Sequence, residues 1–171
     1  MEGKRFKEQI FQSSTSRLEP FTFIVRPMIA ADLGAVTTIE SENPSPWTAG
    51  QLASERDQEG GWQFVAEFGA SGLVCGFVCG RSCAGEAELL KIAVGIGYRR
   101  KGIAAQLVAH ALGYLAGQGV GRCFLELRAG NLPALALYEG VGFLRVGLRK
   151  NYYASPSEDA ILMGKIVLVG A

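Results

Sequence analysis

A cationic turn that contains one glycine, Arg99 to Gly102, separates an apolar run that ends at Val94 from a long apolar-periodic segment that begins at Ile103. The pattern predicts a strand, a turn and a helix start, which together direct backbone N–H groups and the positive end of a helix dipole at one point. Such a point binds anions, and phosphate is the anion that we expect here. The alternative is an ordinary basic turn whose side chains are solvated.

Two well-known phosphate-binding turns can be tested directly against the sequence. A Walker loop requires Gly-x4-Gly-Lys-Ser/Thr, and the chain contains no such string. A Rossmann fingerprint requires Gly-x-Gly-x-x-Gly after the first strand, whereas here Gly95 and Gly97 follow a late strand and position 100 is an arginine. Both nucleotide-binding turns are therefore excluded.

The turn Arg99-x-x-Gly102-x-Ala104 is similar to the R/Q-x-x-G-x-G/A turn of the GNAT superfamily of N-acetyltransferases, which holds the pyrophosphate of acetyl-CoA. Downstream, LELRAGN at residues 125–131 and ALALYEGVGF at residues 134–143 resemble the LEVRxSN…AxxLYxxxGF block of the ribosomal-protein alanine N-acetyltransferases (RimI-like) in that superfamily. Shorter segments add to the resemblance: Pro46-Trp47, Ile92-Ala93-Val94, Arg149-Lys150-Asn151-Tyr152-Tyr153 and Glu158-Asp159-Ala160. Together these segments run from about residue 36 to residue 166.

The chain departs from the family pattern at three places. After the strand, Gly95-Ile96-Gly97-Tyr98 stands where the family tends to have Asp-Pro-x-Tyr. Gly130 replaces the usual serine, and Ala104 and Ala105 occupy positions where glycine and a basic residue are common. These changes affect individual cofactor contacts, but the backbone donors of the turn survive any change of side chain.

The resemblance implies an α/β fold of the GNAT (acyl-CoA N-acyltransferase) type, a mixed and mostly antiparallel central sheet of about seven strands flanked by about four helices. It also implies acetyl-CoA as cosubstrate and no metal. The residues that it assigns to cofactor binding are Ile92, Ala93, Val94, Arg99, Arg100, Lys101, Gly102, Ile103, Ala104, Ala105 and Asn131. For Asn131, capping of a helix is the alternative role, and both can hold together.

Acetyl transfer from a thioester to an amine requires a neutral amine, a stabilised oxyanion and a protonated leaving thiolate. An N-terminal amine has a reference pKa of about 8, so weak assistance by a base suffices near neutrality. Glu126 lies on the same predicted strand face as Phe124 and Arg128 and is the candidate base implied by the resemblance, acting directly or through a water. The alternative is an ordinary solvated glutamate on a strand.

Tyr138 is the candidate acid implied by the resemblance. A phenol, with a pKa of about 10, is close enough to a thiol, at about 8.5, to protonate a leaving thiolate when its surroundings favour it. The alternative is a core aromatic residue. Backbone N–H groups of Ile92–Val94 are expected to orient the thioester and to serve the oxyanion, although the segment also reads as a plain core strand.

The resemblance places the acceptor groove at Tyr152 and Tyr153, in the loop before the last predicted strand, with Trp47 on the opposite side. Trp47 is equally well explained as a core anchor. The implied activity is that of an enzyme that acetylates the N-terminal α-amine of a protein, with the N-terminal alanine of a ribosomal small-subunit protein as the expected acceptor. The alternatives are a lysine side chain, whose pKa of about 10.4 demands a stronger base, a small amine, or a non-catalytic acyl-CoA-binding module.

Four cysteines invite a metal interpretation, because Cys75, Cys79 and Cys83 recur every four residues. However, the chain has no CxxC pair and a single histidine, His110, whereas structural zinc takes four ligands that are usually in close pairs. Cys75 and Cys79 are predicted on one face of a strand, where reduced thiols pack as small hydrophobic groups.

Composition predicts one globular domain in a chain of 171 residues with 49% hydrophobic residues and a formal charge of +1. The near-neutral charge argues against direct nucleic-acid binding, and no apolar run reaches the ~18–20 residues of a membrane span. The first twenty residues have no apolar segment typical of a signal peptide, so we expect a cytoplasmic protein that is a monomer or weak dimer. We expect residues 1–20 to be a tail of unknown role and residues 21–171 to form the single N-acetyltransferase domain that the resemblance implies.

The elements that must position these residues alternate along the chain as β-α-α-β-β-β-α-β-α-β-β. Strands are predicted at residues 21–26, 62–68, 73–80, 86–94, 122–128, 143–148 and 160–168. Helices are predicted at residues 30–40, from a Thr48/Gln51 capping box onward, from Ile103 to Gly117, and after Asn131. A polar loop, Arg149–Asp159, is expected to join the last two strands.

Overall fold

The computed structural model describes residues 22–167, with the placement of the Ala70 side chain excepted. Its element order confirms the predicted one, and short 3-10 helices are added at Ala30–Asp32, Gly69–Ser71 and Ile96–Tyr98. The strands are β1 (Phe23–Pro27), β2 (Gly61–Phe68), β3 (Leu73–Cys83), β4 (Glu86–Val94), β5 (Arg122–Arg128), β6 (Leu144–Ala154) and β7 (Ser157–Ile166). The helices are α1 (Leu33–Glu40), α2 (Ala49–Arg56), α3 (Ile103–Gly117) and α4 (Leu132–Gly140). The expected tail, residues 1–20, lies outside the described residues, as does the expected end of the last strand at Leu168.

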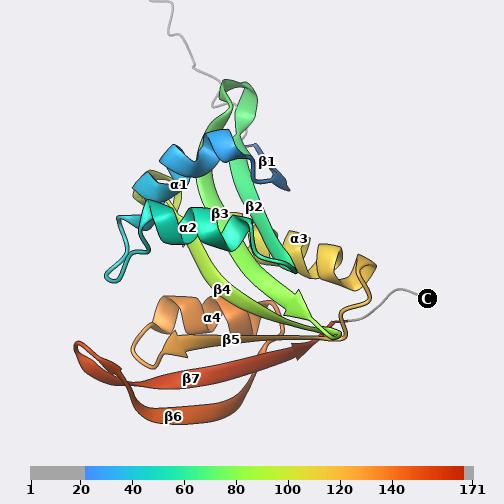
Figure 1. Ribbon diagram of the computed structural model, residues 1–171. Helices are drawn as coiled ribbons and strands as arrows, with labels where there is room; N and C mark the ends of the chain where they lie inside the picture. The colour runs from blue at the N-terminus through green and yellow to red at the C-terminus, as the bar shows by residue number, and fades with distance from the viewer. Residues whose placement is uncertain (1–21, 168–171) are drawn as a thin grey trace, which may run out of the picture.

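All strands join one seven-stranded sheet in the order β1-β2-β3-β4-β5-β7-β6 (Figure 1). Only β4 and β5 pair in parallel, and every other neighbouring pair is antiparallel. The predicted fold class, a mixed and mostly antiparallel sheet with four α-helices, is therefore confirmed. Within residues 22–167, no helix combines the length and the apolar character that crossing a bilayer requires.

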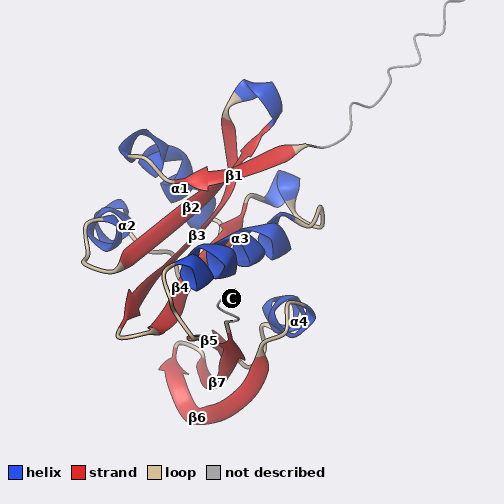
Figure 2. Cartoon of the chain, turned by 90° about the vertical axis from the view of Figure 1, so that its right-hand side faces the viewer, coloured by secondary structure: helices blue, strands red, loops and turns tan. Residues whose placement is uncertain are grey.

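The helices cover the sheet from both sides, with α1 and α2 on one face and α3 and α4 on the other (Figures 1 and 2). Val36 and Ile39 of α1 and Leu52 of α2 share a buried cluster with Phe77 of β3. A larger cluster on the other face joins α3 and α4 to the sheet, and its α3 members are Ile103, Leu107, Val108, Ala111 and Leu115. These α3 residues are the apolar stripe expected from the sequence.

Side-chain caps fix the starts of α2 and α4 as predicted. Thr48 Oγ1 accepts the N–H of Gln51 at 3.2 Å, and the Gln51 side chain accepts the N–H of Thr48, which completes a capping box. Asn131 Oδ1 accepts the N–H of Ala134 at 3.2 Å at the start of α4. Both caps supply acceptors for N–H groups that a helix leaves unpaired in its first turn.

Strands β4 and β5 stay together for only a short distance. They pair from Glu86–Glu88 with Arg122–Phe124 and then part, while β4 remains paired with β3 as far as Val94 and β5 with β7 as far as Arg128. Leu90 is the extra residue of a bulge in β4, between the pairs Cys79↔Lys91 and Gly80↔Leu89. A bulge bends its strand and increases the local twist, which helps to open a gap between the two halves of the sheet.

The prediction that Cys75 and Cys79 share one face of a strand is wrong. Ala66 of β2 pairs with Gly76 and Glu67 pairs with Val74, so Cys75 is an unpaired bulge residue in β3. One extra residue reverses the alternation of side chains. Cys75 therefore lies in the cluster beneath α3, whereas Cys79 lies in the cluster beneath α1 and α2.

The predicted extent of the last strand pair was also too short. Residues 149–154 and 157–159 belong to β6 and β7 rather than to a loop, so Tyr152 and Tyr153 lie on β6. Lys150, Asn151 and Tyr152 oppose only Asp159, because Arg149 pairs with Ala160 and Tyr153 with Glu158. Asn151, at φ 52°, donates its N–H to Asp159 Oδ1 at 2.8 Å, so the polar sequence pairs through an irregular ladder that alternation could not reveal.

Candidate active site

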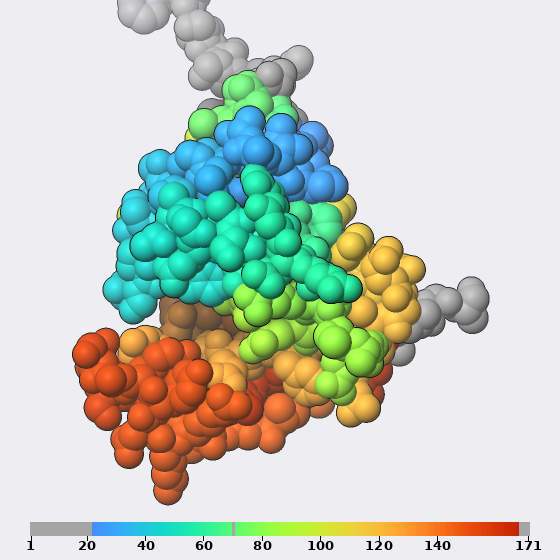
Figure 3. All heavy atoms as spheres, viewed as in Figure 1, coloured from blue at the N-terminus to red at the C-terminus, as the bar shows by residue number. Residues whose placement is uncertain are grey.

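A cleft runs across the face of the sheet that carries α1 and α2. The space-filling view shows it as a hollow between the blue and cyan surface of α1 and α2 and the red and orange surface of β6 and β7 (Figure 3). The loop between α1 and α2 and the hairpin turn between β6 and β7 lie on the same side of the molecule (Figure 1). The gap between β4 and β5 opens between these two walls.

Glu126 stands on the cleft face of β5, together with Phe124 and Arg128, as the sequence predicted. Its side chain is 21% exposed, and its Oε1 lies 3.0 Å from Arg149 Nη1 in an ion pair. Arg149 reaches it from β6, with β7 lying between the two strands. The candidate base is therefore a half-buried carboxylate with one arginine partner.

Tyr138 lies on α4 and is buried, and its ring packs edge-on against Phe143 at a centroid distance of 5.7 Å. It belongs to the cluster that contains Cys123, Leu125 and Leu127, the residues on the opposite face of β5 from Glu126. Burial raises the pKa of Tyr138 well above its usual value near 10, so the hydroxyl keeps its proton.

The candidate phosphate turn has the backbone geometry that an anion site requires. Arg100 and Gly102 have φ values of 63° and 79°, in the left-handed region, and Gly102 is the N-terminal cap of α3. No side chain caps α3, so the N–H groups of its first turn, residues 102–105, have no side-chain acceptor. The turn therefore directs free donors and the positive helix end outward.

The cationic side chains of the turn differ in what they bind. Arg99 Nε donates to the carbonyl of Val94 at 2.9 Å, and its Nη2 lies 3.4 Å from Glu42 Oε2. Lys101 Nζ donates to the Gly97 carbonyl at 3.3 Å and lies over the ring of Tyr98. Arg99 thus supports the base of the turn, and Arg100, which is exposed, extends from its rim.

The backbone of Ile92–Val94 lies on the β4 side of the gap. Gly95 N–H donates to the Cys75 carbonyl at 3.0 Å, and in an antiparallel ladder such bonded residues alternate with residues that point away. The alternation turns the backbone groups of Ile92 and Val94 away from β3, toward the side that β5 has left, whereas Ala93 faces β3. Two of the three predicted residues therefore offer backbone donors to the gap.

The predicted acceptor residues lie on the two walls of the cleft. Tyr152 and Tyr153 of β6 contact each other at a centroid distance of 5.1 Å, with the guanidinium of Arg149 5.3 Å from the first ring and that of Arg128 4.1 Å from the second. On the other wall, Trp47 is half-buried and Lys91 Nζ lies 5.4 Å from its ring centre.

Sequence reasoning missed Glu40, which holds the wall that carries Trp47. Glu40 is fully buried, and its Oε1 lies 2.7 Å from Lys91 Nζ in an ion pair and accepts the Trp47 N–H at 3.0 Å, while its Oε2 accepts from Asn43 Nδ2 at 2.6 Å. The ion pair and the two hydrogen bonds compensate the burial of the carboxylate. The available signal was an acid adjacent to Ile39 on the apolar stripe of α1.

Sequence reasoning also missed Glu42, which lies in the loop between α1 and α2. Its Oε2 accepts the N–H of Ile96 at 2.8 Å and lies near Arg99, so it ties the α1–α2 loop to the candidate phosphate turn. No local pattern indicated this contact, because the partners are more than fifty residues apart in the sequence. The candidate phosphate turn and one wall of the cleft are therefore joined directly.

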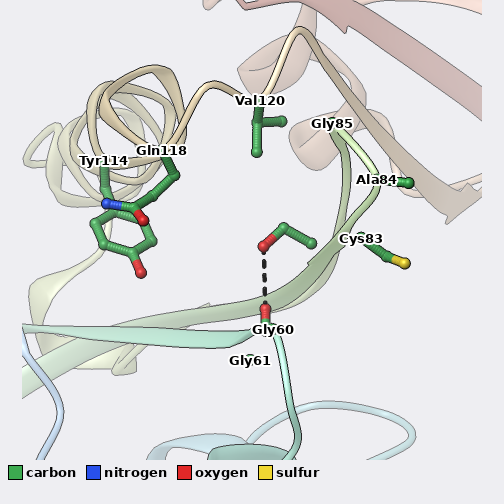
Figure 4. Close-up of a pocket in the computed structure, with 9 residues that line it drawn as sticks. Gly60, Gly61, Cys83, Ala84, Gly85, Tyr114, Gln118 and Val120 are labelled. Carbon is green, nitrogen blue, oxygen red and sulfur yellow. Dashed lines mark hydrogen bonds between the residues drawn. The ribbon is translucent and has the colours of Figure 1, made fainter.

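Two pockets lie outside the cleft. One of about 380 Å³ is lined by Gly60, Gly61 and the β3–β4 turn, with Tyr114 of α3 and Gln118, the residue after α3, on its other side (Figure 4). Ser82 Oγ donates to the Gly60 carbonyl there at 3.2 Å. A second, of about 320 Å³, lies beside Phe124 and Glu88. Neither pocket is lined by a predicted site residue.

The cysteines do not gather into a metal site in the structure. Cys75, Cys79 and Cys123 are buried and Cys83 is exposed, and burial raises the pKa of the Cys79 thiol to about 12. Within residues 22–167 no group of three or more histidine, cysteine, aspartate or glutamate side chains is placed to hold a metal ion.

Comparison with known proteins decides the family. The model of the acetyltransferase (GNAT) family matches residues 32–143, which include both candidate catalytic residues and the phosphate turn. The chain belongs to the GNAT acetyltransferase family. A relative of this GNAT protein, the [ribosomal protein bS18]-alanine N-acetyltransferase of Escherichia coli K12, is 35% identical over 135 residues, which cover 77% of this chain and 89% of the relative. The N-alpha-acetyltransferase RimI of Mycobacterium tuberculosis is 42% identical over 84 residues, 49% of this chain and 51% of its own length.

Solved structures agree with this assignment of the GNAT chain. The crystal structure of the ribosomal-protein-S18-alanine N-acetyltransferase from Escherichia coli superposes with a TM-score of 0.79 at 31% identity, covering 88% of this chain and 97% of that one. Ard1 from Thermoplasma volcanium gives a TM-score of 0.77 at 27% identity, with 85% and 98% covered. The protein is thus an enzyme of the acetyltransferase class.

Proposed function

We propose that this protein transfers acetyl from acetyl-CoA to the N-terminal α-amine of a protein, with the N-terminal alanine of the small-subunit ribosomal protein bS18 as its acceptor. The observation that carries the proposal is the 35% identity to the Escherichia coli bS18-alanine N-acetyltransferase across 89% of that enzyme. The cleft with two aromatic walls supports a peptide acceptor. A ribosomal acceptor would place the protein in the cytoplasm, and the near-neutral charge favours a protein rather than a nucleic acid as the direct partner.

The free backbone donors of the structure fit a pyrophosphate followed by an extended arm. The first-turn N–H groups of α3 and the side chains of Arg100 and Lys101 would hold the pyrophosphate, with Arg99 bracing the turn. Ile92 and Val94 would bind the arm along β4 through the donors that β5 leaves unpaired. Acetyl-CoA, when bound, supplies an activated acetyl group as a thioester. Asn131 lies at the start of α4 and would contact the cofactor beside its cap.

Glu126 and Tyr138 face opposite sides of β5, and this separation suits the two proton transfers of the reaction. On the cleft face, Glu126 takes a proton from the acceptor ammonium, directly or through a water, and so releases the nucleophilic amine. On the other face, the Tyr138 hydroxyl gives its proton to the departing thiolate. Burial raises the pKa of Tyr138, which keeps the hydroxyl protonated but makes it a weaker acid, so the transfer depends on its position beside the thiolate. The thioester C–S bond breaks, an amide C–N bond forms, and one proton passes to solvent overall.

Initial rates of CoA release with three substrates test the proposal. These are a peptide that begins with alanine, an N-blocked peptide with an internal lysine, and a small primary amine. We expect turnover with the first peptide, because the α-amine deprotonates near neutrality and lysine does not. Preference for the blocked peptide or the small amine would move the acceptor to those classes. Binding of acetyl-CoA without turnover of any substrate would instead identify a non-catalytic acyl-CoA-binding module.

A further inference from the structure

Arg149 connects the candidate base to the tyrosine wall of the cleft. Its Nη1 lies 3.0 Å from Glu126 Oε1, and its guanidinium lies 5.3 Å from the ring centre of Tyr152. The side chain reaches Glu126 across β7, where the Cα partner of Arg149 is Ala160. Glu126 pairs with Leu162, two residues further along β7, so the ion pair runs diagonally across that strand.

No other cation in the described residues takes this place. Arg128, two residues from Glu126 on the same face, donates to Glu158 Oε2 at 3.1 Å and to the carbonyls of Pro156 and Ser155 at 3.3 Å. Its guanidinium also lies over Tyr153 at 4.1 Å. Arg128 is therefore committed to the β6–β7 turn, and Arg149 is the only ion-pair partner of Glu126 within residues 22–167.

We propose that Arg149 is a positioning residue for acetyl transfer, which holds one oxygen of the Glu126 carboxylate so that the other faces the acceptor amine. The inference rests on the proposed function, because it assumes that Glu126 is the base. A carboxylate that is held at Oε1 cannot rotate freely, so Oε2 keeps one orientation in the cleft. The planar guanidinium also lies over the ring of Tyr152, and a lysine cannot make both contacts in the same geometry.

This arrangement links the orientation of the base to the acceptor wall. Loss of the guanidinium would free the Glu126 carboxylate, which lowers kcat, and would loosen Tyr152, which raises KM for the peptide. It would leave acetyl-CoA binding unchanged, because the turn and β4 do not contact Arg149. A residue with a purely structural role would lower stability without this pattern.

The first measurement compares Arg149→Gln and Arg149→Lys with a matched control, Arg145→Gln. Arg145 lies on the same strand, is similarly exposed at 56% against 52%, and pairs with Glu139 of α4 at 3.0 Å. We expect Arg149→Gln to lower kcat by about 10–100-fold, the loss that a misplaced catalytic group causes, with Arg149→Lys intermediate. Arg145→Gln should keep the wild-type kcat, and all three variants should keep the wild-type KM for acetyl-CoA.

A double-mutant cycle decides whether Arg149 acts through Glu126. If it does, the variant with both Glu126→Gln and Arg149→Gln will be no slower than Glu126→Gln alone. Losses that multiply would overturn the inference, as would a wild-type kcat in Arg149→Gln. Melting temperatures show whether a variant is folded. If Arg149→Gln does not fold, the same comparison is made with Arg149→Lys. If the wild type acetylates no α-amine, the proposed function fails and the role of Arg149 fails with it.

Discussion

The two halves of the sheet differ in how they are covered. Every residue of β3 from Val74 to Gly80 is buried, because α1 and α2 lie over one face of this half and α3 over the other. In β6, by contrast, every residue except Tyr153 is exposed. The half formed by β5, β7 and β6 is packed by α4 on one face and presents Glu126, Arg128 and Arg149 on the other.

This difference corresponds to the two tasks that we propose. The cofactor turn and the gap-side strand β4 belong to the half that is buried on both faces, so backbone donors there are held rigidly. The acceptor wall and the base belong to the half that is open on one face, where ion pairs rather than core packing set side-chain positions. Rigid backbone suits a constant cosubstrate, and an open face admits a peptide.

The largest expected effect comes from the two candidate catalytic residues on either side of β5. Glu126→Gln and Tyr138→Phe should each lower kcat by about 10²–10⁴-fold, the usual contribution of a positioned acid or base. Acetyl-CoA affinity, measured by calorimetry, should change little, because neither side chain belongs to the phosphate turn. Wild-type turnover in both variants would contradict the roles of Glu126 as base and Tyr138 as acid.

Two leucines test the difference in burial between the two halves of the sheet. Leu107 of α3 is fully buried and Leu144 of β6 is 71% exposed. Leu107→Ala should lower the free energy of unfolding by about 2–5 kcal/mol, because it leaves a cavity in the core. Leu144→Ala should change it by less than about 0.5 kcal/mol. Urea unfolding measures both, and equal losses would contradict the difference between the halves.

Matched caps separate stability from cofactor binding. Thr48 and Asn131 each accept a first-turn N–H at 3.2 Å, on α2 and α4 respectively. Thr48→Ala and Asn131→Ala should each reduce stability by about 1 kcal/mol. Only Asn131→Ala should also raise KM for acetyl-CoA. If the two variants have the same KM, Asn131 is a cap alone.

The smallest effect concerns an ion pair of the first half. Hydrogen bonds from Arg26 hold the pKa of Asp32 below its usual 3.8. The stabilisation is therefore complete above about pH 4 and is lost as the pH falls through the lowered pKa. Asp32→Asn should cost about 1 kcal/mol at pH 7, since Arg26 is partly exposed. The difference in the free energy of unfolding between Asp32→Asn and the wild type should shrink below pH 4. A difference that does not change with pH would contradict the stabilising role of the ion pair.

Most of the order of elements could be predicted from the sequence, because helical and strand periodicities, prolines, glycines and capping residues are local signals. The stripe from Ile103 to Leu115 and the alternation of Arg122–Arg128 each gave the correct face. The extent of β6 could not be predicted, since Asn151 and Asp159 satisfy each other only when the two strands are side by side. The prediction of the strand face that Cys75 occupies was wrong for the same reason, because a bulge exists only relative to the partner strand.

The sequence by itself determined the order of the elements and the turn at Arg99–Gly102, since these depend on residue types within a few positions of one another. The fold class and the candidates Glu126 and Tyr138 came from the family resemblance, which is spread over short motifs along the chain. Only the tertiary structure decided that Glu126 and Tyr138 face opposite sides of β5 at the gap beside β4, and that Arg149 lies 3.0 Å from Glu126. Glu40 and Glu42 were likewise revealed by their partners on distant segments. Such contacts depend on strand register and on parting of the sheet, which arise from pairing between segments far apart in the chain.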